Sequence, residues 1–395
     1  MRKSLLAVPV LLAVALISAC SSTTTSTESS SAAATVEASA EPTVSAPAES
    51  APADPQCGTT VEEIAAAAKA EGGLNLIALP DSWANYKGIL QSFADNYGIT
   101  PVVANPDASS ADELTAIATL AGQPSKPDSV DIGPSFLEQF VNDGMSVQYQ
   151  TTNWSEIPDN LKDPAGNWVG SYYGIMSIAS NSTLVKNPPK SYADLLKPEY
   201  KGMVTLNGDP REAGAAFAAV VAASLANGGS YDDLTPGIEY FAELKKLGNL
   251  QTVDVTPAAL LSGDVPIALD WTYNFPAIVP VMKEAGFDLN ISIPTDGLYG
   301  GYYAQGIVSD TVHPCAARLW MEHITGNDGA LGYITGGAVP ARLGAMQAAG
   351  LITPELAKNL PTEEQLAQIT FPTMEQVELL KAQLTEQWGP KVADA

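Results

Sequence analysis

The stretch NWVGSYYGIMSIASN, residues 167–181, divides the sequence into two parts with similar patterns. Its small, aromatic and β-branched residues predict one long β-strand. Before it, short apolar runs such as LNLIAL (74–79) and SVDIG (129–133) alternate with helical patterns, and the alternation resumes at MVTLN (203–207). Such alternation is typical of an α/β fold with a mostly parallel sheet. The sequence therefore predicts an α/β protein with two lobes, joined by extended crossings and separated by a ligand cleft.

The order of the patterns also predicts the segments of each lobe. The first helix is expected from Thr60, where Glu63 completes a capping box, to the pair Gly72-Gly73. The alanine-rich run after residue 213 is too short for a membrane span and predicts a core helix. The expected segments are 57–177 for the first part of lobe 1, 178–270 for lobe 2, 271–312 for a return to lobe 1, and 313–395 for a mainly helical segment that packs on lobe 2.

Residues 1–20 have the pattern of an export signal. Arg2 and Lys3 precede an apolar stretch, 5–17, that is too short to span a bilayer comfortably. Two small residues then come directly before Cys20, an order that resembles a bacterial lipobox, the signal for attaching a diacylglycerol to the cysteine thioether. Cleavage nearby without modification is the alternative. We expect an exported protein, periplasmic or lipid-anchored to the outer face of the cytoplasmic membrane.

Residues 21–56 consist mainly of Ser, Thr, Ala, Pro and Glu. A segment with so little apolar surface cannot offset its ordering entropy, so a disordered tether is expected. Cys57 follows the tether and Cys315 opens an apparent helix. An exported compartment permits a disulfide between them, and two separate thiols are the alternative.

The charge of the chain limits its partners. It has 395 residues with 19 Lys and Arg against 44 Asp and Glu, a formal net charge of -25. Binding to nucleic acid or to anionic lipid by charge is therefore not expected. A cationic ligand is compatible with this charge, although an acidic surface that keeps the protein soluble explains the total equally well.

Signatures of catalysis are absent from the sequence. It has no nucleophile elbow, no H-E-x-x-H, no P-loop and no G-x-G-x-x-G. His313 and His323 lie ten residues apart in an apparent helix, which is not a metal-ligand spacing on one face, and are expected at the surface or in packing. We expect no catalytic residue, no metal and no cofactor. An enzyme that uses paired carboxylates stays open as an alternative.

Two phrases of the sequence resemble a known family. PPKSYADLLKPEYKGMVTL (188–206) is similar to a P-x-S-w-x-D-L-l-x-P-x-y-k-G segment of polyamine, iron and phosphonate binders, and GALGYITGGAVPAR (329–342) also looks like that group. Over about residues 72–350 the chain resembles a solute-binding lipoprotein of an ABC importer with the type II periplasmic-binding fold. The resemblance implies a non-enzymatic subunit. Its lobes would close around a small solute and deliver it to a membrane permease with its own ATPase.

Spermidine/putrescine binders of this group carry Trp-x-x-Tyr in the first β-to-α loop and Asp-x-Arg-Glu after a strand of the second lobe. Here SWANY supplies Trp83 and Tyr86, and GDPRE supplies Asp209 and Glu212. The resemblance implies that the carboxylates hold an amine between aromatic walls, while Arg211 orients a carboxylate. The alternative is that Asp209 caps the next helix, with Pro at the first position and Glu at the third.

Further candidates mostly follow strand-like runs, where ligands gather in open α/β sheets. Ionised acceptors and aromatic faces would suit a protonated amine. Neighbouring tyrosines on a strand point to opposite faces, so at most one residue of the pair Tyr172–Tyr173 and one of Tyr302–Tyr303 should face the cleft. The additional candidate ligand-binding residues are Asp81, Ser135, Tyr173, Asp270, Trp271, Tyr273, Tyr299 and Tyr302.

A polyamine such as putrescine or spermidine is the expected solute. Ferric ion held by tyrosine phenolates is one alternative, and a phosphonate or other anion at Arg211 is another. A lipoprotein scaffold that binds another protein is a rival of a different class, which would show a large exposed apolar patch.

Overall fold

The structure is a computed structural model that describes Gln56–Asp394. The expected signal peptide, its lipid-attachment residue Cys20 and the tether up to residue 55 lie outside the described residues. Within the described range no helix has both the length and the apolar character to cross a bilayer.

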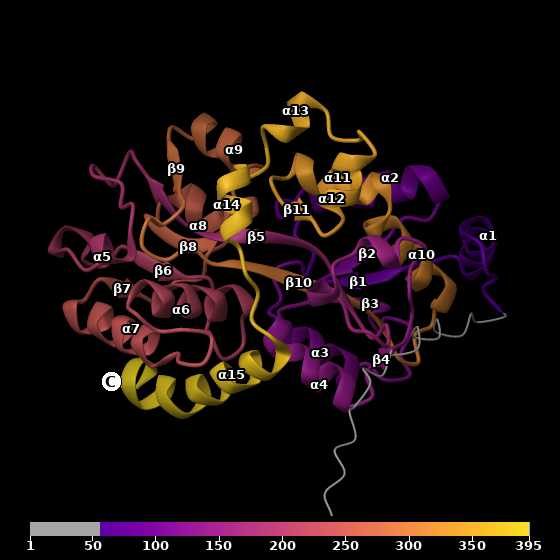
Figure 1. Cartoon of the computed structure of the whole chain (residues 1–395), viewed down its shortest axis with the longest axis horizontal. Helices are drawn as coiled ribbons and strands as arrows, with labels where there is room; N and C mark the ends of the chain where they lie inside the picture. Colours follow the sequence, from indigo (N-terminus) through magenta and orange to yellow (C-terminus); the bar gives the residue numbers. More distant parts are fainter. Residues whose placement is uncertain (1–55, 395) are drawn as a thin grey trace, which may run out of the picture. The chain divides into compact units, whose positions relative to one another are not determined.

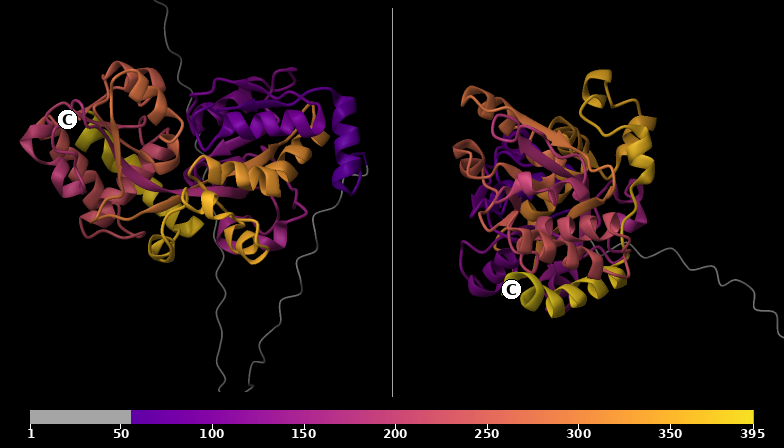
Figure 2. Two further views of the ribbon diagram at one scale, coloured as in Figure 1. Left: turned by 90° about the horizontal axis from the view of Figure 1, so that it is seen from above. Right: turned by 90° about the vertical axis from the view of Figure 1, so that its left-hand side faces the viewer.

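Two long strands run through the middle of the molecule (Figure 1). β5 (Val169–Asn181) pairs antiparallel with β10 (Gly300–Val308) in a sheet of order β3-β10-β5-β8-β6-β7. At one end β10 pairs with β3, and at the other β5 pairs with β8. The left view of Figure 2 has a group of helices on either side of these strands. The predicted α/β fold with two lobes and extended crossings is confirmed.

Lobe 1 is built around four short strands and the helices that cover them. The capping box of Thr60 and Glu63 and the glycine end of the first helix are confirmed. Its strands are β1 (Asn75–Ile77), β2 (Val102–Ala104), β3 (Ser129–Ile132) and β4 (Ser146–Val147), and its helices are α1 (Val61–Glu71), α2 (Tyr86–Tyr97), α3 (Ser110–Thr119) and α4 (Leu137–Asn142), with the 3₁₀ turn η1 (Pro134–Phe136).

Lobe 2 surrounds α6 (Gly214–Ala226), whose residues up to Ser224 are all buried. The alanine-rich run is therefore a core helix, as predicted. The other elements are the strands β6 (Val204–Leu206), β7 (Leu250–Gln251), β8 (Ile267–Trp271) and β9 (Leu289–Ser292), the helices α5 (Tyr192–Leu195), α7 (Thr235–Leu247), α8 (Pro257–Ser262) and α9 (Ile278–Glu284), and the 3₁₀ turn η5 (Thr272–Asn274).

The chain returns to lobe 1 later than the expected segment 271–312. α9 and β9 stay in lobe 2, because β9 pairs with the second half of β5, with Asn290 opposite Ser180. The return crossing is β10. Sequence patterns could not place it, since β9 and β10 are both strand-like and only their pairing decides the lobe.

The C-terminal segment also differs from the expectation that 313–395 packs on lobe 2. α10 (Pro314–Thr325) and α11 (Asn327–Thr335) pack on α1 and α2 of lobe 1, because the apolar residues of α10 are buried there. α15 (Met374–Trp388) contacts both η1 and α7, so it touches both lobes. Between them lie β11 (Val339–Pro340), α12 (Leu343–Ala348), α13 (Pro354–Ala357) and α14 (Glu363–Gln368).

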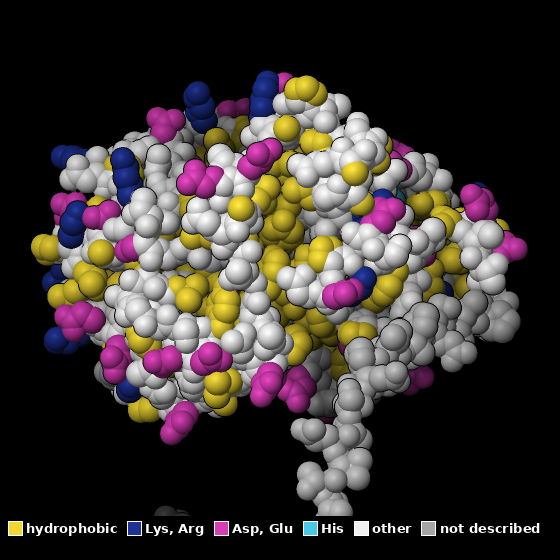
Figure 3. Space-filling view, viewed as in Figure 1, with side chains coloured by type: hydrophobic (Ala, Val, Ile, Leu, Met, Phe, Trp, Pro, Cys, Tyr) yellow, Lys and Arg dark blue, Asp and Glu magenta, His cyan; other side chains and the backbone are white. Residues whose placement is uncertain are grey.

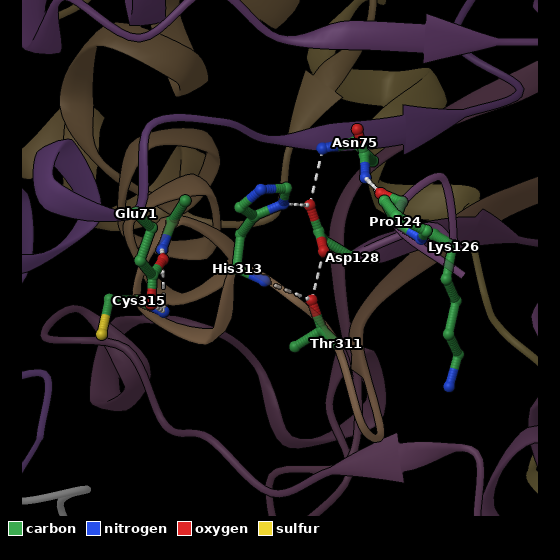
Figure 4. Close-up of polar contacts among 9 residues, drawn as sticks. Glu71, Asn75, Pro124, Lys126, Asp128, Thr311, His313 and Cys315 are labelled. Atoms are coloured by element: carbon green, nitrogen blue, oxygen red, sulfur yellow. Dashed lines mark hydrogen bonds and ion pairs between the residues drawn. The ribbon is translucent and has the colours of Figure 1, made fainter. Parts of the chain in front are cut away.

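A disulfide joins the start of the folded body to α10. Cys57 and Cys315 are bonded, with 5.2 Å between their Cα atoms. Glu71, at the end of α1, accepts the backbone N–H groups of Cys315 and Ala316 at 2.8–3.1 Å (Figure 4). A carboxylate at this position satisfies the first donors of α10 and complements its dipole.

Next to this junction the buried carboxylate of Asp128 accepts three hydrogen bonds (Figure 4). The donors are the backbone N–H of Asn75 at 2.6 Å, Nδ1 of His313 at 2.9 Å, and the hydroxyl of Thr311. His323 is buried among aromatic rings, and burial lowers its pKa to about 4. Both histidines therefore pack, as expected.

We expect the double variant Cys57→Ala, Cys315→Ala to lose about 2–5 kcal/mol of unfolding free energy, because the crosslink restricts a long loop of the unfolded chain. Urea unfolding measures the loss. Dithiothreitol should lower the wild-type midpoint similarly and leave the double variant unchanged. If the reductant has no effect on the wild type, the crosslink contributes nothing to stability.

Candidate ligand-binding site

A cavity of about 300 Å³ lies where the two lobes meet. Lobe 1 contributes the loop after β1, the loop before α3, the first turn of α3 and the end of β3. Lobe 2 contributes the loop before α6 with the start of that helix, and the loop before α8. The crossing strand β10 contributes one tyrosine. The lining residues are Ala78, Trp83, Asp107, Ala108, Ser109, Ser110, Asp112, Glu113, Asp131, Asn207, Gly208, Asp209, Glu212, Ala213, Gly214, Ala215, Asp254, Val255, Thr256 and Tyr303.

The lobes contact each other beside this cavity. The backbone N–H of Ala111 in α3 donates to the carbonyl of Glu212 at 3.2 Å. Gly133 and Gly214 also meet closely, since a Cβ atom on Gly214 would lie 3.1 Å from Cα of Gly133 and 3.0 Å from the hydroxyl of Tyr303. The lobes therefore meet through backbone atoms at a point where a larger residue would hold them apart.

Carboxylates dominate the cavity wall. Seven of the lining residues are Asp or Glu, and none is Lys, Arg or His. On the face in Figure 3 most of the basic side chains lie toward the left and upper edges of the view, away from the junction of the lobes. The cavity therefore offers strong acceptors without a basic residue in its wall, which suits a cation.

The GDPRE stretch forms a turn before α6. The carbonyl of Asp209 accepts from the backbone N–H groups of Glu212 and Ala213, and α6 begins only at Gly214 without a side-chain cap. The alternative that Asp209 and Glu212 only cap the helix is therefore wrong. Residue 209 lies too far ahead of the first helical turn.

Arg211 orients the Asp209 carboxylate, as expected. It donates from its backbone N–H and Nε at 2.9 Å and from Nη2 at 2.6 Å. These hydrogen bonds hold the pKa of Asp209 below its ordinary value. Arg211 thus offsets the charge of Asp209, and its hydrogen bonds go to Asp209 rather than to Glu212.

A second group of acids lies deeper. Oδ2 of Asp131, at the end of β3, accepts from the hydroxyls of Tyr86 at 2.7 Å and Tyr172 at 3.0 Å. Oε2 of Glu113 accepts the backbone N–H of Asp131 at 2.9 Å. Burial raises the pKa of Asp131 to about 7, partly offset by the two phenol hydrogen bonds, and raises the pKa of Glu113 as well.

Asp270 lies behind the wall rather than in it. Its Oδ2 accepts from Nδ2 of Asn207, a lining residue, at 3.0 Å, and its Oδ1 accepts the backbone N–H of Trp271 at 2.8 Å. Burial raises the pKa of Asp270 to about 6. Asp270 can therefore orient the Asn207 amide toward the cavity.

Three of the residues expected from the sequence line the cavity: Trp83, Asp209 and Glu212. Four lie directly behind it: Tyr86 and Tyr273 beside Asp131, Asp270 behind Asn207, and Trp271 edge-on to Tyr303.

The other five residues expected from the sequence lie elsewhere. Asp81 is exposed, the Ser135 carbonyl accepts from Lys381 at 2.6 Å, Tyr173 packs on Phe371, Tyr299 packs on Tyr231 and Trp271, and Tyr302 stacks on Trp168.

Each tyrosine pair splits across its strand, as the alternation of side chains requires. The members on the cavity side are Tyr172 and Tyr303, whereas the sequence interpretation favoured Tyr173 and Tyr302. The sequence interpretation also missed Glu113 and most of the other acids. Asp131 alone had a detectable signal, since it lies at the end of the run SVDIG, where ligands gather in such sheets.

The raised pKa of Asp131 predicts a pH-dependent stability. A carboxyl whose folded pKa of about 7 exceeds the ordinary 3.8 stabilises the fold below the lower value and loses this contribution as pH rises through the higher one. We expect the melting temperature of ligand-free wild type to fall more steeply from about pH 5 to about pH 8 than that of Asp131→Asn. Exposed Asp143→Asn serves as the control. Equal slopes for wild type and Asp131→Asn would contradict this.

The approach of Gly133 and Gly214 predicts that Gly214→Ala hinders closure of the lobes. The new methyl group would press on backbone and on the Tyr303 hydroxyl. Small-angle X-ray scattering should give a larger radius of gyration than for wild type. Gly344→Ala, which meets open space in α12, should match wild type. An unchanged radius in Gly214→Ala would show that the two glycines do not limit the approach of the lobes.

Solved structures with the same fold are numerous, and the three described next each cover about four fifths of this chain. The periplasmic binding protein AfuA of Actinobacillus pleuropneumoniae, with exogenous fructose-6-phosphate bound, has 17% identity and a TM-score of 0.65 over 82% of this chain and 99% of its own. The spermidine/putrescine ABC transporter substrate-binding protein PotD of Streptococcus pneumoniae has 16% identity and a TM-score of 0.54, and the match covers 80% of this chain and 99% of its own. Iron-bound HitA of Pseudomonas aeruginosa has 18% identity and a TM-score of 0.57, and the match covers 80% of this chain and 98% of its own.

At such identities these structures establish the fold alone. Among curated protein sequences, none matches this chain. The sequence profile of the bacterial extracellular solute-binding proteins, however, matches residues 126–375, more than half of the chain. The chain belongs to the family of bacterial extracellular solute-binding proteins.

Proposed function

We propose that this protein is the extracytoplasmic subunit of an ABC importer that captures a small cationic amine, such as putrescine or spermidine, between its lobes. The observation that carries the proposal is the cavity wall, with seven acids and no basic residue. Carboxylates in so confined a place repel one another, and a protonated amine would relieve the repulsion and donate hydrogen bonds to them.

The shape of the cavity supports the same class of solute. Its volume of about 300 Å³ is at the lower end of ordinary small-molecule sites. Trp83 offers an aromatic face to a cation or to methylene groups. One of the similar structures is that of a spermidine/putrescine transporter's binding protein, which favours the proposal without deciding the solute.

Delivery requires a membrane permease with its ATPase, because this chain has no nucleotide-binding motif. We propose that a lipid on Cys20 holds the protein at the outer face of the cytoplasmic membrane, with residues 21–56 as a tether. One acyl chain binds a membrane weakly, whereas a diacylglycerol anchors it stably.

One observation favours an anionic solute as the second candidate. α6 begins in the cavity wall without a side-chain cap, so its first N–H groups can face a ligand, and such a helix end attracts negative charge. A ferric site has less support. Among the described residues, the one group of three His, Cys, Asp or Glu ligand atoms within 4.8 Å is Cys57, Glu71 and Cys315, and none of these residues lines the cavity.

A thermal melt of the purified protein with putrescine or spermidine tests the proposal. A solute at a hundredfold excess over its Kd adds about 2.7 kcal/mol, and the melting temperature should rise clearly. Glu212→Gln should reduce the rise, and Asp143→Asn should not. The amine should be recovered unchanged, since turnover would indicate an enzyme. A rise with phosphate or a phosphonate but with neither amine would favour the anionic candidate instead.

A further inference from the structure

Two buried carboxylates lie at the deep end of the cavity, and neither has a basic partner among the described residues. Asp131 is 3% exposed and Glu113 is 1% exposed, and the backbone N–H of Asp131 donates to Glu113. Buried carboxylates in proteins are normally paired with a cation or kept protonated, because an isolated charge is costly away from water. This pair therefore requires either protons or a cation from outside the chain.

The two oxygens of Asp131 differ in their surroundings. Oδ2 accepts the hydroxyls of Tyr86 and Tyr172. Oδ1 is buried and has no hydrogen-bond partner among the described residues. Asp131 is also one of the residues that line the cavity, so this acceptor lies next to the space that a ligand would occupy. An unsatisfied buried acceptor is uncommon in a folded protein and calls for a partner.

The groups that face Asp131 are acids and phenols on every element around it. None of the described groups that interact with it electrostatically is Lys, Arg or His. They are Glu113 of α3, Tyr86 of α2, Tyr172 of β5, Tyr273 of η5, Tyr303 of β10 and Tyr333 of α11. A positive charge at Oδ1 must therefore come from the solute.

We infer that Oδ1 of Asp131 is the primary acceptor for the ammonium group of the solute, and that the Asp131 carboxyl releases its proton when the solute binds. This inference rests on the proposed function, since it requires a cationic solute. Protonated Asp131 and R–NH₃⁺ give the carboxylate–ammonium pair and one H⁺, which leaves to solvent. No bond of the solute is made or broken.

The acids of the GDPRE turn then have a different role from Asp131. Asp209 and Glu212 lie in the more exposed part of the wall, and Arg211 offsets the charge of Asp209. Salt screens exposed charges, so Asp209 and Glu212 hold an amine only weakly. Their role is to attract the amine to the entrance of the cavity. Asp131, away from water, supplies the stronger contact.

A pH-dependent affinity follows. Burial raises the pKa of Asp131 to about 7, so the empty site is mostly protonated at about pH 6 and mostly ionised at about pH 8. The amine must displace the proton at the lower pH. We expect the affinity to weaken about tenfold for each pH unit below the pKa and to level off above it.

Isothermal titration calorimetry with putrescine and spermidine, at about pH 6 and about pH 8, tests this on wild type, Asp131→Asn and the exposed control Asp143→Asn. We expect Asp131→Asn to bind about 100-fold more weakly at the higher pH and to lose the pH dependence, because the amide carries no charge and does not titrate. Asp143→Asn should behave like wild type.

The outcomes separate the two proposals. If wild type binds neither amine at either pH, the proposed function fails and this inference with it. If wild type binds and Asp131→Asn keeps both its affinity and its pH dependence, the amine binds elsewhere in the protein and only this inference is overturned.

A measurement on wild type alone covers the case in which Asp131→Asn does not fold. Titrations in two buffers of different ionisation enthalpy count the protons released on binding. Near pH 6 we expect close to one proton, and near pH 8 close to none. Binding without proton release at the lower pH would overturn the inference.

Discussion

The pairing of β5 with β10 is the constraint on which the rest of the structure depends. Both strands extend through the two lobes, so each lobe completes its sheet on one end of the same antiparallel pair. The register, with Tyr302 opposite Tyr173 and Tyr303 opposite Tyr172, decides which tyrosines face the cavity. A shift of one residue would turn every side chain to the other face.

Glycines in these strands let aromatic rings approach the sheet. A Cβ atom on Gly174 would lie 2.4 Å from the ring of Tyr273, and one on Gly301 would lie 2.4 Å from the ring of Trp271. The register then shifts between Tyr303 and Gln305, which bends the strand at the lobe junction. Small residues in the crossings thus make room for the aromatic layer behind the cavity wall.

A buried hydrogen-bond network extends from this layer into lobe 1. Trp320 of α10 donates to Gln305 at 2.9 Å, and Gln305 donates to the hydroxyl of Tyr86 at 2.8 Å. Tyr86 in turn donates to Asp131. The network fixes Oδ2 of Asp131 and thereby the direction of Oδ1. The same low dielectric that strengthens these hydrogen bonds makes an uncompensated charge on Asp131 costly.

Local patterns were enough to predict the lobes, the long crossing strand and the capped first helix, because each depends on residues close in sequence. The predictions failed where distant pairing decides the outcome. The strand pattern around Tyr302 allows either Tyr302 or Tyr303 to face the cavity. Only the pairing with β5 determines that it is Tyr303. Glu113 belongs to a helix whose pattern gives no sign of a ligand, and it reaches the cavity only because α3 packs on β3.

Closure and charge act together at the cavity. The contact between Gly133 and Gly214 brings backbone against backbone, and Ala111 then reaches the carbonyl of Glu212. As the lobes approach, water leaves the acids between them, and their mutual repulsion strengthens in the lower dielectric. A cation between the lobes turns that repulsion into attraction. The acidic wall therefore opposes closure when it is empty and favours closure when it holds a cation, so the solute can select the closed state by its charge.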